Sequence, residues 1–164
     1  MFILARAIAY SVLFIGVLLV YLPARVVAAG GLASRSASDI QQVAGMVLAS
    51  LGAVVAVWCI LSFVSIGRGT PAPFDPPRRL VVRGPYRFVR NPMYIGAAIA
   101  LGGAALSYSS LSLLTYTALF FAATHLLVIF YEEPALGRSF GAEYEAYRHA
   151  VRRWVPRWQP SPRA

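Results

Sequence analysis

The sequence predicts an all-α polytopic membrane protein, with about four transmembrane helices and a C-terminal amphipathic helix at the membrane interface. The first reason is composition: 59% of the 164 residues are hydrophobic and the mean hydropathy is +0.64, which is too apolar for a soluble protein of this length. The second is the presence of apolar runs long enough to cross a bilayer. The third is the charge, since all 15 basic residues are arginine and only six acids oppose them. We expect one integral membrane domain, residues 1–164.

Four apolar segments account for the predicted helices: residues 3–27, 43–66, 92–106 and 111–131. The first two form an N-terminal pair of transmembrane helices within residues 1–66. The third is short of the roughly 20 residues that span a bilayer, and the tight turn "LSYSSL" joins it to the fourth as a helical hairpin. The first segment could instead be a signal peptide, because "VVAAGG" at 26–31 offers small residues for cleavage, but its apolar stretch is long for one.

The arginines predict the orientation in the membrane. With four spans and the N-terminus inside, 13 arginines lie on the inner side and only Arg25 and Arg35 lie outside. The positive-inside rule favours this arrangement, with both termini cytoplasmic, and we expect the inner membrane of a bacterium. The loop 67–91 and the C-terminal tail then share the cytoplasmic side, where we expect the chemistry to take place.

Three other interpretations are disfavoured. A pI of about 10.4 fits nucleic-acid binding, but no aromatic residues interleave with arginines outside the loops, so we expect no nucleic-acid partner. Cys59 lies in an apolar run and belongs to no metal motif, so no metal is expected. Gly67, Gly69 and Ala72 resemble a dinucleotide fingerprint, but that motif needs a preceding strand, and the prolines within 71–77 form a stiff connector instead.

The stretch "RNPMY" at 90–94 predicts a helix start. Asn91 suits the N-cap and Pro92 suits the first helical position, where a missing N–H costs nothing. A helix N-terminus attracts an anion, and Arg87 and Arg90 add positive charge beside it. The alternative is an ordinary helix start flanked by interfacial arginines.

Two adjacent acids, Glu132 and Glu133, end the fourth apolar segment. A carboxylate there meets the negative end of the helix dipole, and ionisable groups at such depth often mark a function. The alternative is a structural clamp in which both acids pair with loop arginines. On helical spacing His125, Val128 and Glu132 share one face. His125 is either a satisfied interior histidine or a proton acceptor.

The tail is predicted to form an amphipathic interfacial helix. Its apolar face comprises Leu136, Phe140, Tyr144, Tyr147 and Val151, at spacings of 4, 4, 3 and 4. Its opposite face comprises Arg138, Glu145, Arg148 and Arg152.

Three stretches occur in order: "GPYRFVRNPMYIG", "YEEP" and "FGAEYEAYRHAVRRWVP". Together they resemble the isoprenylcysteine carboxyl methyltransferases and the related membrane phospholipid N-methyltransferases, which are integral membrane enzymes that use S-adenosyl-L-methionine without a Rossmann fold. The resemblance covers residues 67–156, which we expect to be the cofactor-binding core. It implies methyl transfer to a lipid-like or small amphiphilic acceptor at the cytoplasmic face, among membrane lipids.

The resemblance also implies the site residues. Those that line the cofactor pocket are Tyr86, Asn91, Pro92, Met93 and Tyr94, with backbone contacts from Arg79, Leu80 and Val81. Glu132 and Glu133 match the cofactor-binding acids, which would satisfy the ammonium, sulfonium and ribose hydroxyls. Arg90 and the helix start at Asn91 would suit the cofactor carboxylate. His125 or a glutamate could accept a proton from an amine acceptor.

Two departures concern the acceptor. The isoprenylcysteine enzymes have histidine where Asn91 stands and an anion-binding arginine where Val128 stands, whereas the phospholipid enzymes share Asn-Pro-Met-Tyr and Tyr-Glu-Glu-Pro. This favours an amine or phospholipid head group over a prenylcysteine and predicts that Val128→Arg would improve activity on the acid. Two other functions stay open at this point: an NADPH-dependent membrane reductase of the sterol-reductase type, and a non-catalytic structural membrane protein whose Glu–Arg pairs fix the tail.

Overall fold

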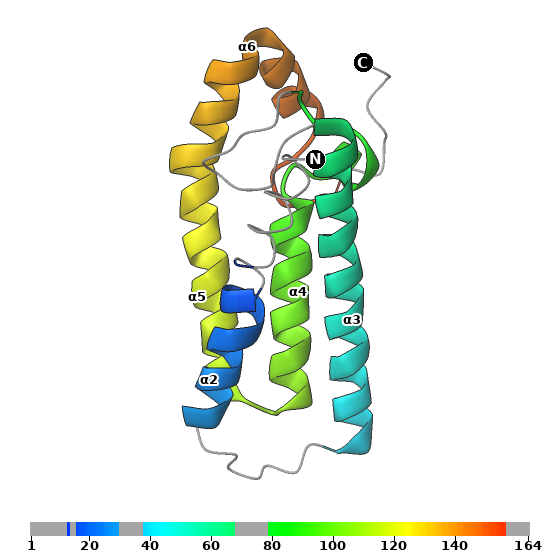
Figure 1. Cartoon of the computed structure of the whole chain (residues 1–164), viewed down its shortest axis with the longest axis vertical. Helices are drawn as coiled ribbons and strands as arrows, with labels where there is room; N and C mark the ends of the chain where they lie inside the picture. Colours follow the sequence, from blue (N-terminus) through cyan, green and yellow to red (C-terminus); the bar gives the residue numbers. More distant parts are fainter. Residues whose placement is uncertain (1–12, 14–15, 30–37, 68–78, 157–164) are drawn as a thin grey trace.

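The computed structural model describes residues 13, 16–29, 38–67 and 79–156, and in these ranges the chain is helical with no β-strand. The elements are the π-helix η1 (Gly16–Tyr21), α2 (Leu22–Ala29), α3 (Asp39–Ser62), the π-helix η2 (Phe63–Gly67), the 3-10 helix η3 (Gly84–Arg87), α4 (Pro92–Ser107), α5 (Leu111–Leu127), the π-helix η4 (Val128–Glu132) and α6 (Glu133–Ala150). The predicted all-α class is confirmed for this part of the chain. Helix α4 lies between α3 and α5 (Figure 1).

The helices coincide with the four predicted apolar segments wherever the chain is described. Two continuous stretches, Asp39–Gly67 and Leu111–Ala150, are long and apolar enough to cross a membrane. Gly16–Ala29 and Pro92–Ser107 are shorter apolar helices. Helix α3 exposes large apolar side chains, as expected of a helix that contacts lipid: Ile40, Val43, Met46, Val47, Leu51, Val54, Val57 and Leu61.

Glycines bring α3 and α4 into backbone contact. Gly45 and Gly52 lie seven residues apart on α3, and Gly96 and Gly103 lie seven residues apart on α4. A Cβ atom at Gly103 would lie 2.6 Å from the carbonyl oxygen of Gly45, and one at Gly96 would lie 2.8 Å from that of Gly52. Small residues permit such close helix packing in membranes. This contact fixes α4, and with it the first turn of α4, relative to α3.

The predicted turn between the third and fourth apolar segments is confirmed. It comprises residues 108–110, with Ser109 in the left-handed region at a φ of 46°. The Ser110 hydroxyl caps α5 by accepting a hydrogen bond from the Leu113 amide at 3.2 Å. Gln41 Nε2, in the first turn of α3, donates to the Ser109 hydroxyl at 3.0 Å. The turn therefore connects α3, α4 and α5 at this end of the molecule.

The main core lies between α4 and α5. Its buried members are Tyr94, Ala97, Leu101, Phe120 and Val128. The N-terminal helices pack on it from outside, and the Tyr116 hydroxyl donates to the Leu18 carbonyl oxygen at 2.8 Å. Val128 is completely buried, so its side chain has no contact with solvent.

Helix α5 continues through η4 into α6, which contains the predicted amphipathic tail. The burial pattern is as predicted, because Tyr144 and Val151 are buried and the exposed residues include Arg138, Glu145, Arg148 and Arg152. The prediction of one unbroken helix through Val151 was wrong. Gly141 has φ 52° and ψ −124°, and α6 ends at Ala150. Glycine adopts a positive φ readily, so the chain bends there and turns back toward η3 (Figure 1).

Some sequence predictions lie outside the described residues. They concern the proline connector at 71–77, positions 69 and 72 of the rejected fingerprint, and residues 30–31 of the alternative cleavage stretch.

Candidate functional site

The loop before α4 and the segment after α6 meet at one end of the helix bundle. The Arg90 amide donates to the Arg152 carbonyl oxygen at 2.9 Å. Asn91 Nδ2 donates to the Arg153 carbonyl oxygen at 3.2 Å. The prediction that the loop and the tail lie on the same face is confirmed, while the side of the membrane on which this face lies stays a prediction.

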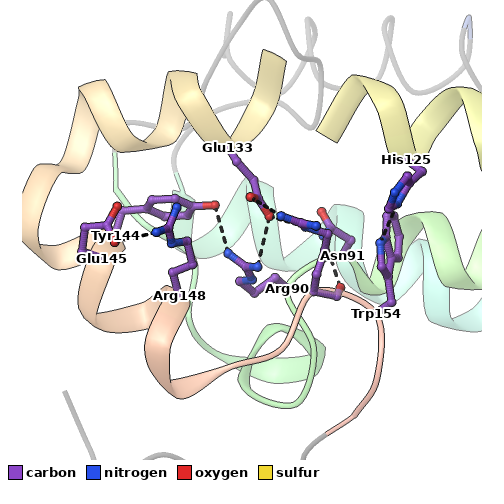
Figure 2. Close-up of polar contacts among 9 residues, drawn as sticks. Arg90, Asn91, His125, Glu133, Tyr144, Glu145, Arg148 and Trp154 are labelled. Carbon is purple, nitrogen blue, oxygen red and sulfur yellow. Dashed lines mark hydrogen bonds and ion pairs between the residues drawn. The ribbon is translucent and has the colours of Figure 1, made fainter. Parts of the chain in front are cut away.

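Helix α4 starts where the sequence predicts, at Pro92, with Asn91 at the N-cap position. The Asn91 side chain, however, makes no capping hydrogen bond, because it is turned toward Arg153 instead (Figure 2). The position was therefore predicted correctly and the capping bond was not. Without that cap, the first-turn amides of Met93 and Tyr94 keep their donor capacity for another acceptor.

The two adjacent glutamates have different partners. The Tyr94 hydroxyl donates a short hydrogen bond to Glu132 Oε1. The Glu133 carboxylate accepts two hydrogen bonds from Arg153, at 2.7 and 2.8 Å, and lies 3.1 Å from an Arg90 terminal nitrogen (Figure 2). Glu132 ends η4 and Glu133 begins α6, and π-helical turns within α-helices occur frequently at functional sites.

The structural-clamp interpretation of the acid pair therefore fits Glu133 but not Glu132. Glu133 forms the predicted clamp, with Arg90 on one side and Arg153 on the other. These hydrogen bonds raise the pKa of Arg153, so its charge persists at any ordinary pH. Glu132 has no cationic partner among the described residues and accepts only from Tyr94 there.

Arg90 is nearly buried, with 9% of its side chain exposed. One terminal nitrogen pairs with Glu133 and the other donates to the Tyr144 hydroxyl at 3.4 Å. Its Nε is buried and has no hydrogen-bond partner in the described part of the chain. An unsatisfied buried donor is costly, so this N–H is suited to an acceptor from a bound molecule.

Tyr86 belongs to a second cluster beside the first turn of α4. It packs with buried Cys59 and Val81, and Met93 contacts both this cluster and the main core. The Tyr147 hydroxyl donates to the Tyr86 carbonyl oxygen at 2.7 Å, which ties α6 to the loop. Burial, above all, raises the pKa of Tyr86, so its hydroxyl stays neutral.

The remaining predicted residues lie at the margin of this end. Leu80 is buried beside Val81, whereas Arg79 is exposed and its amide donates to the Gly67 carbonyl oxygen at 3.3 Å. The structure thus places Arg90, Asn91 and Glu133 in one set of contacts around Arg153, and Tyr94 with Glu132 in a second set that adjoins it through the neighbouring glutamates. Val81, Tyr86 and Met93 belong to a separate apolar cluster. The described residues contain no group of three or more His, Cys, Asp or Glu that could hold a metal ion.

His125 has a partner that the sequence analysis did not identify. Its Nδ1 accepts a hydrogen bond from Trp154 Nε1 at 2.9 Å (Figure 2). The Trp154 ring also packs against Phe121, with ring centroids 4.9 Å apart. No spacing pattern in the sequence indicates this contact, since the two residues lie 29 positions apart. It shows that the segment after α6 contacts α5 as well as α4.

The comparisons with known proteins identify the family. A family model for phospholipid methyltransferase matches residues 40–143, which is more than half of the chain and includes the first turn of α4, η4 and the two glutamates. No curated protein and no solved structure matches the chain. The chain therefore belongs to the phospholipid methyltransferase family, and it is an integral membrane, S-adenosyl-L-methionine-dependent methyltransferase.

Proposed function

We propose that the chain methylates the polar head group of a phospholipid-like acceptor, with the cofactor held where Tyr94, Glu132 and Arg90 meet. One observation carries the proposal. Glu132, a carboxylate without a cationic partner among the described residues, is the chain neighbour of Glu133, which pairs with a buried arginine whose Nε has no acceptor there. Because the chain belongs to the phospholipid methyltransferase family, it is a methyltransferase and not the NADPH-dependent reductase or the non-catalytic structural protein.

The residues present fit the charges of S-adenosyl-L-methionine. Its ammonium and sulfonium groups are positive, and Glu132 offers a carboxylate of low solvent exposure. Its carboxylate is negative, and Arg90 Nε and the first-turn amides of α4 offer donors. Val81, Tyr86 and Met93 supply an apolar wall beside these groups. When bound, the cofactor supplies an electrophilic methyl group for in-line displacement.

The chain contributes orientation and exclusion of water. Glu133 holds the Arg90 guanidinium from one side, so that the direction of its Nε is fixed before any ligand arrives. The Tyr94 hydroxyl likewise fixes the rotamer of Glu132. An amine acceptor must lose a proton before it attacks, and Glu132 is the carboxylate placed to receive it.

The surroundings of Val128 support a head group without a free carboxylate. This side chain is packed among Tyr94, Leu101 and Phe120 and offers neither charge nor a donor. We propose four spans with both termini cytoplasmic, so that the acceptor enters from the bilayer and the cofactor from the cytoplasm.

Calorimetric titration with S-adenosylhomocysteine tests the proposal on the protein in nanodiscs. Glu132→Gln should weaken binding by roughly ten- to a hundredfold, because a charge-assisted hydrogen bond contributes about 1.5–3 kcal/mol. Glu133→Gln is a comparison variant: it leaves two arginines without their shared anion and should lower the free energy of unfolding by on the order of 3 kcal/mol.

If a folded Glu132→Gln protein binds S-adenosylhomocysteine with unchanged affinity, the role of Glu132 is purely structural. The same titration with NADPH should show no binding.

A further inference from the structure

We infer that His125 is a positioning residue that fixes the segment 151–154, here called the strap, across the candidate cofactor site. The inference rests on the proposed function, because the strap contacts the residues assigned to the cofactor. It goes beyond the family match, since the strap lies after the matched residues 40–143.

The strap contacts three of the residues assigned to the candidate site, Arg90, Asn91 and Glu133. Its backbone accepts hydrogen bonds from the Arg90 amide and from the Asn91 side chain, at 2.9 and 3.2 Å. The side chain of Arg153, within the strap, forms the two hydrogen bonds to Glu133. The last strap residue, Trp154, donates to His125 on α5. These contacts connect the start of α4, the start of α6 and α5 through three consecutive residues.

The Trp154 hydrogen bond fixes the protonation pattern of the imidazole. An indole N–H can only donate, so His125 Nδ1 must be an unprotonated acceptor. In neutral histidine the proton then resides on Nε2. Nε2 then already carries its proton, and Nδ1 can accept one only if the Trp154 hydrogen bond breaks. This arrangement suits a fixed acceptor and does not suit a general base.

Loss of the Trp154–His125 hydrogen bond would reach Arg90 through Arg153 and Glu133. If the Trp154–His125 bond is lost, the end of the strap is released and Arg153 is held less firmly against Glu133. Glu133 can then move toward Arg90, its other partner, and the direction of Arg90 Nε changes. We expect cofactor binding to weaken while the methyl-transfer step changes little.

Three variants of the full chain in nanodiscs test this. His125→Ala removes the acceptor, Trp154→Phe removes the donor but keeps a ring, and His125→Gln keeps an acceptor oxygen. The first two should raise the KM for S-adenosyl-L-methionine and the Kd for S-adenosylhomocysteine by about 2- to 12-fold, the effect of one neutral hydrogen bond, with kcat nearly constant. Glutamine should restore the affinity relative to alanine.

If His125→Gln loses kcat as completely as His125→Ala, with KM unchanged, His125 is a base and the inference is wrong. It is also wrong if Trp154→Phe leaves Kd unchanged while Glu132→Gln raises it, and in that case the proposed cofactor site still stands. If Glu132→Gln leaves Kd unchanged, the proposed site itself fails.

A second measurement does not depend on activity. The chain has two histidines, so His149→Gln leaves a single imidazole for ¹⁵N NMR of histidine-labelled protein. We expect the Nε2-protonated tautomer of the neutral imidazole, with the Nδ1 resonance shifting in Trp154→Phe. A proton on Nδ1 would overturn the inference.

Discussion

Replacing Gly103 by alanine should destabilise the protein, whereas the same change at its neighbour Gly102 should not. A Cβ atom at Gly103 would lie 2.6 Å from the Gly45 carbonyl oxygen and closer still to the Ala49 amide nitrogen. A Cβ atom at Gly102 would meet nothing within 4 Å. Both variants gain the same helix propensity, about 1 kcal/mol, so their difference isolates the steric overlap. Overpacking costs about 1–3 kcal/mol, and backbone atoms cannot rotate away.

The free energy of unfolding can be measured by titrating SDS into protein in bicelles while following helicity by circular dichroism. Gly103→Ala should be less stable than Gly102→Ala by about 1–3 kcal/mol. It should also bind S-adenosylhomocysteine more weakly, because α3 positions the helix that carries Tyr94. Equal stability of the two variants would show that α3 and α4 do not pack through these glycines, and the placement of the site would lose its support.

Two further predictions concern topology and the acceptor. A cysteine introduced at Ser36 should be labelled from the outside and one at Ser161 from the inside, because most arginines lie on the same side of the membrane as the tail. The reverse labelling pattern would place the site on the wrong side of the membrane. The sequence predicted that Val128→Arg would improve activity on a carboxylate acceptor. We now expect this variant to be unstable, because Val128 is completely buried and an unpaired buried charge is costly. A stable Val128→Arg protein that methylates a farnesylcysteine analogue would refute this expectation. The wild-type protein should methylate that analogue poorly compared with a phospholipid amine, as product analysis by mass spectrometry can show.

The helices and their arrangement could be predicted because they depend on local signals. The apolar runs and the Asn91–Pro92 start gave the third helix as 92–106, against an observed Pro92–Ser107. The arginine distribution predicted that the loop and the tail lie together, which the Arg90–Arg152 backbone bond confirms. The glycine contact between α3 and α4 had a signal too, a spacing of seven residues in both helices, which the sequence analysis did not use.

The contacts within the site could not be predicted in this way. Adjacent glutamates project in different directions from a helix, and which partner each meets depends on segments far away: Tyr94 lies 38 residues before Glu132, and Arg153 lies 20 residues after Glu133. The bend at Gly141 changes the direction of the tail, and helical spacing carries no signal for it. That bend returns the chain to the site and brings the strap against α5.

The most direct test of the account is photo-crosslinking of radiolabelled S-adenosyl-L-methionine to the wild-type protein in nanodiscs, followed by peptide mapping. We expect label on peptides that contain Tyr94 or Glu132, at the end of the bundle where the strap lies, and loss of this label with excess S-adenosylhomocysteine. Competed label confined to the opposite end of the bundle, in the first half of α3 or in the turn at 108–110, would contradict it.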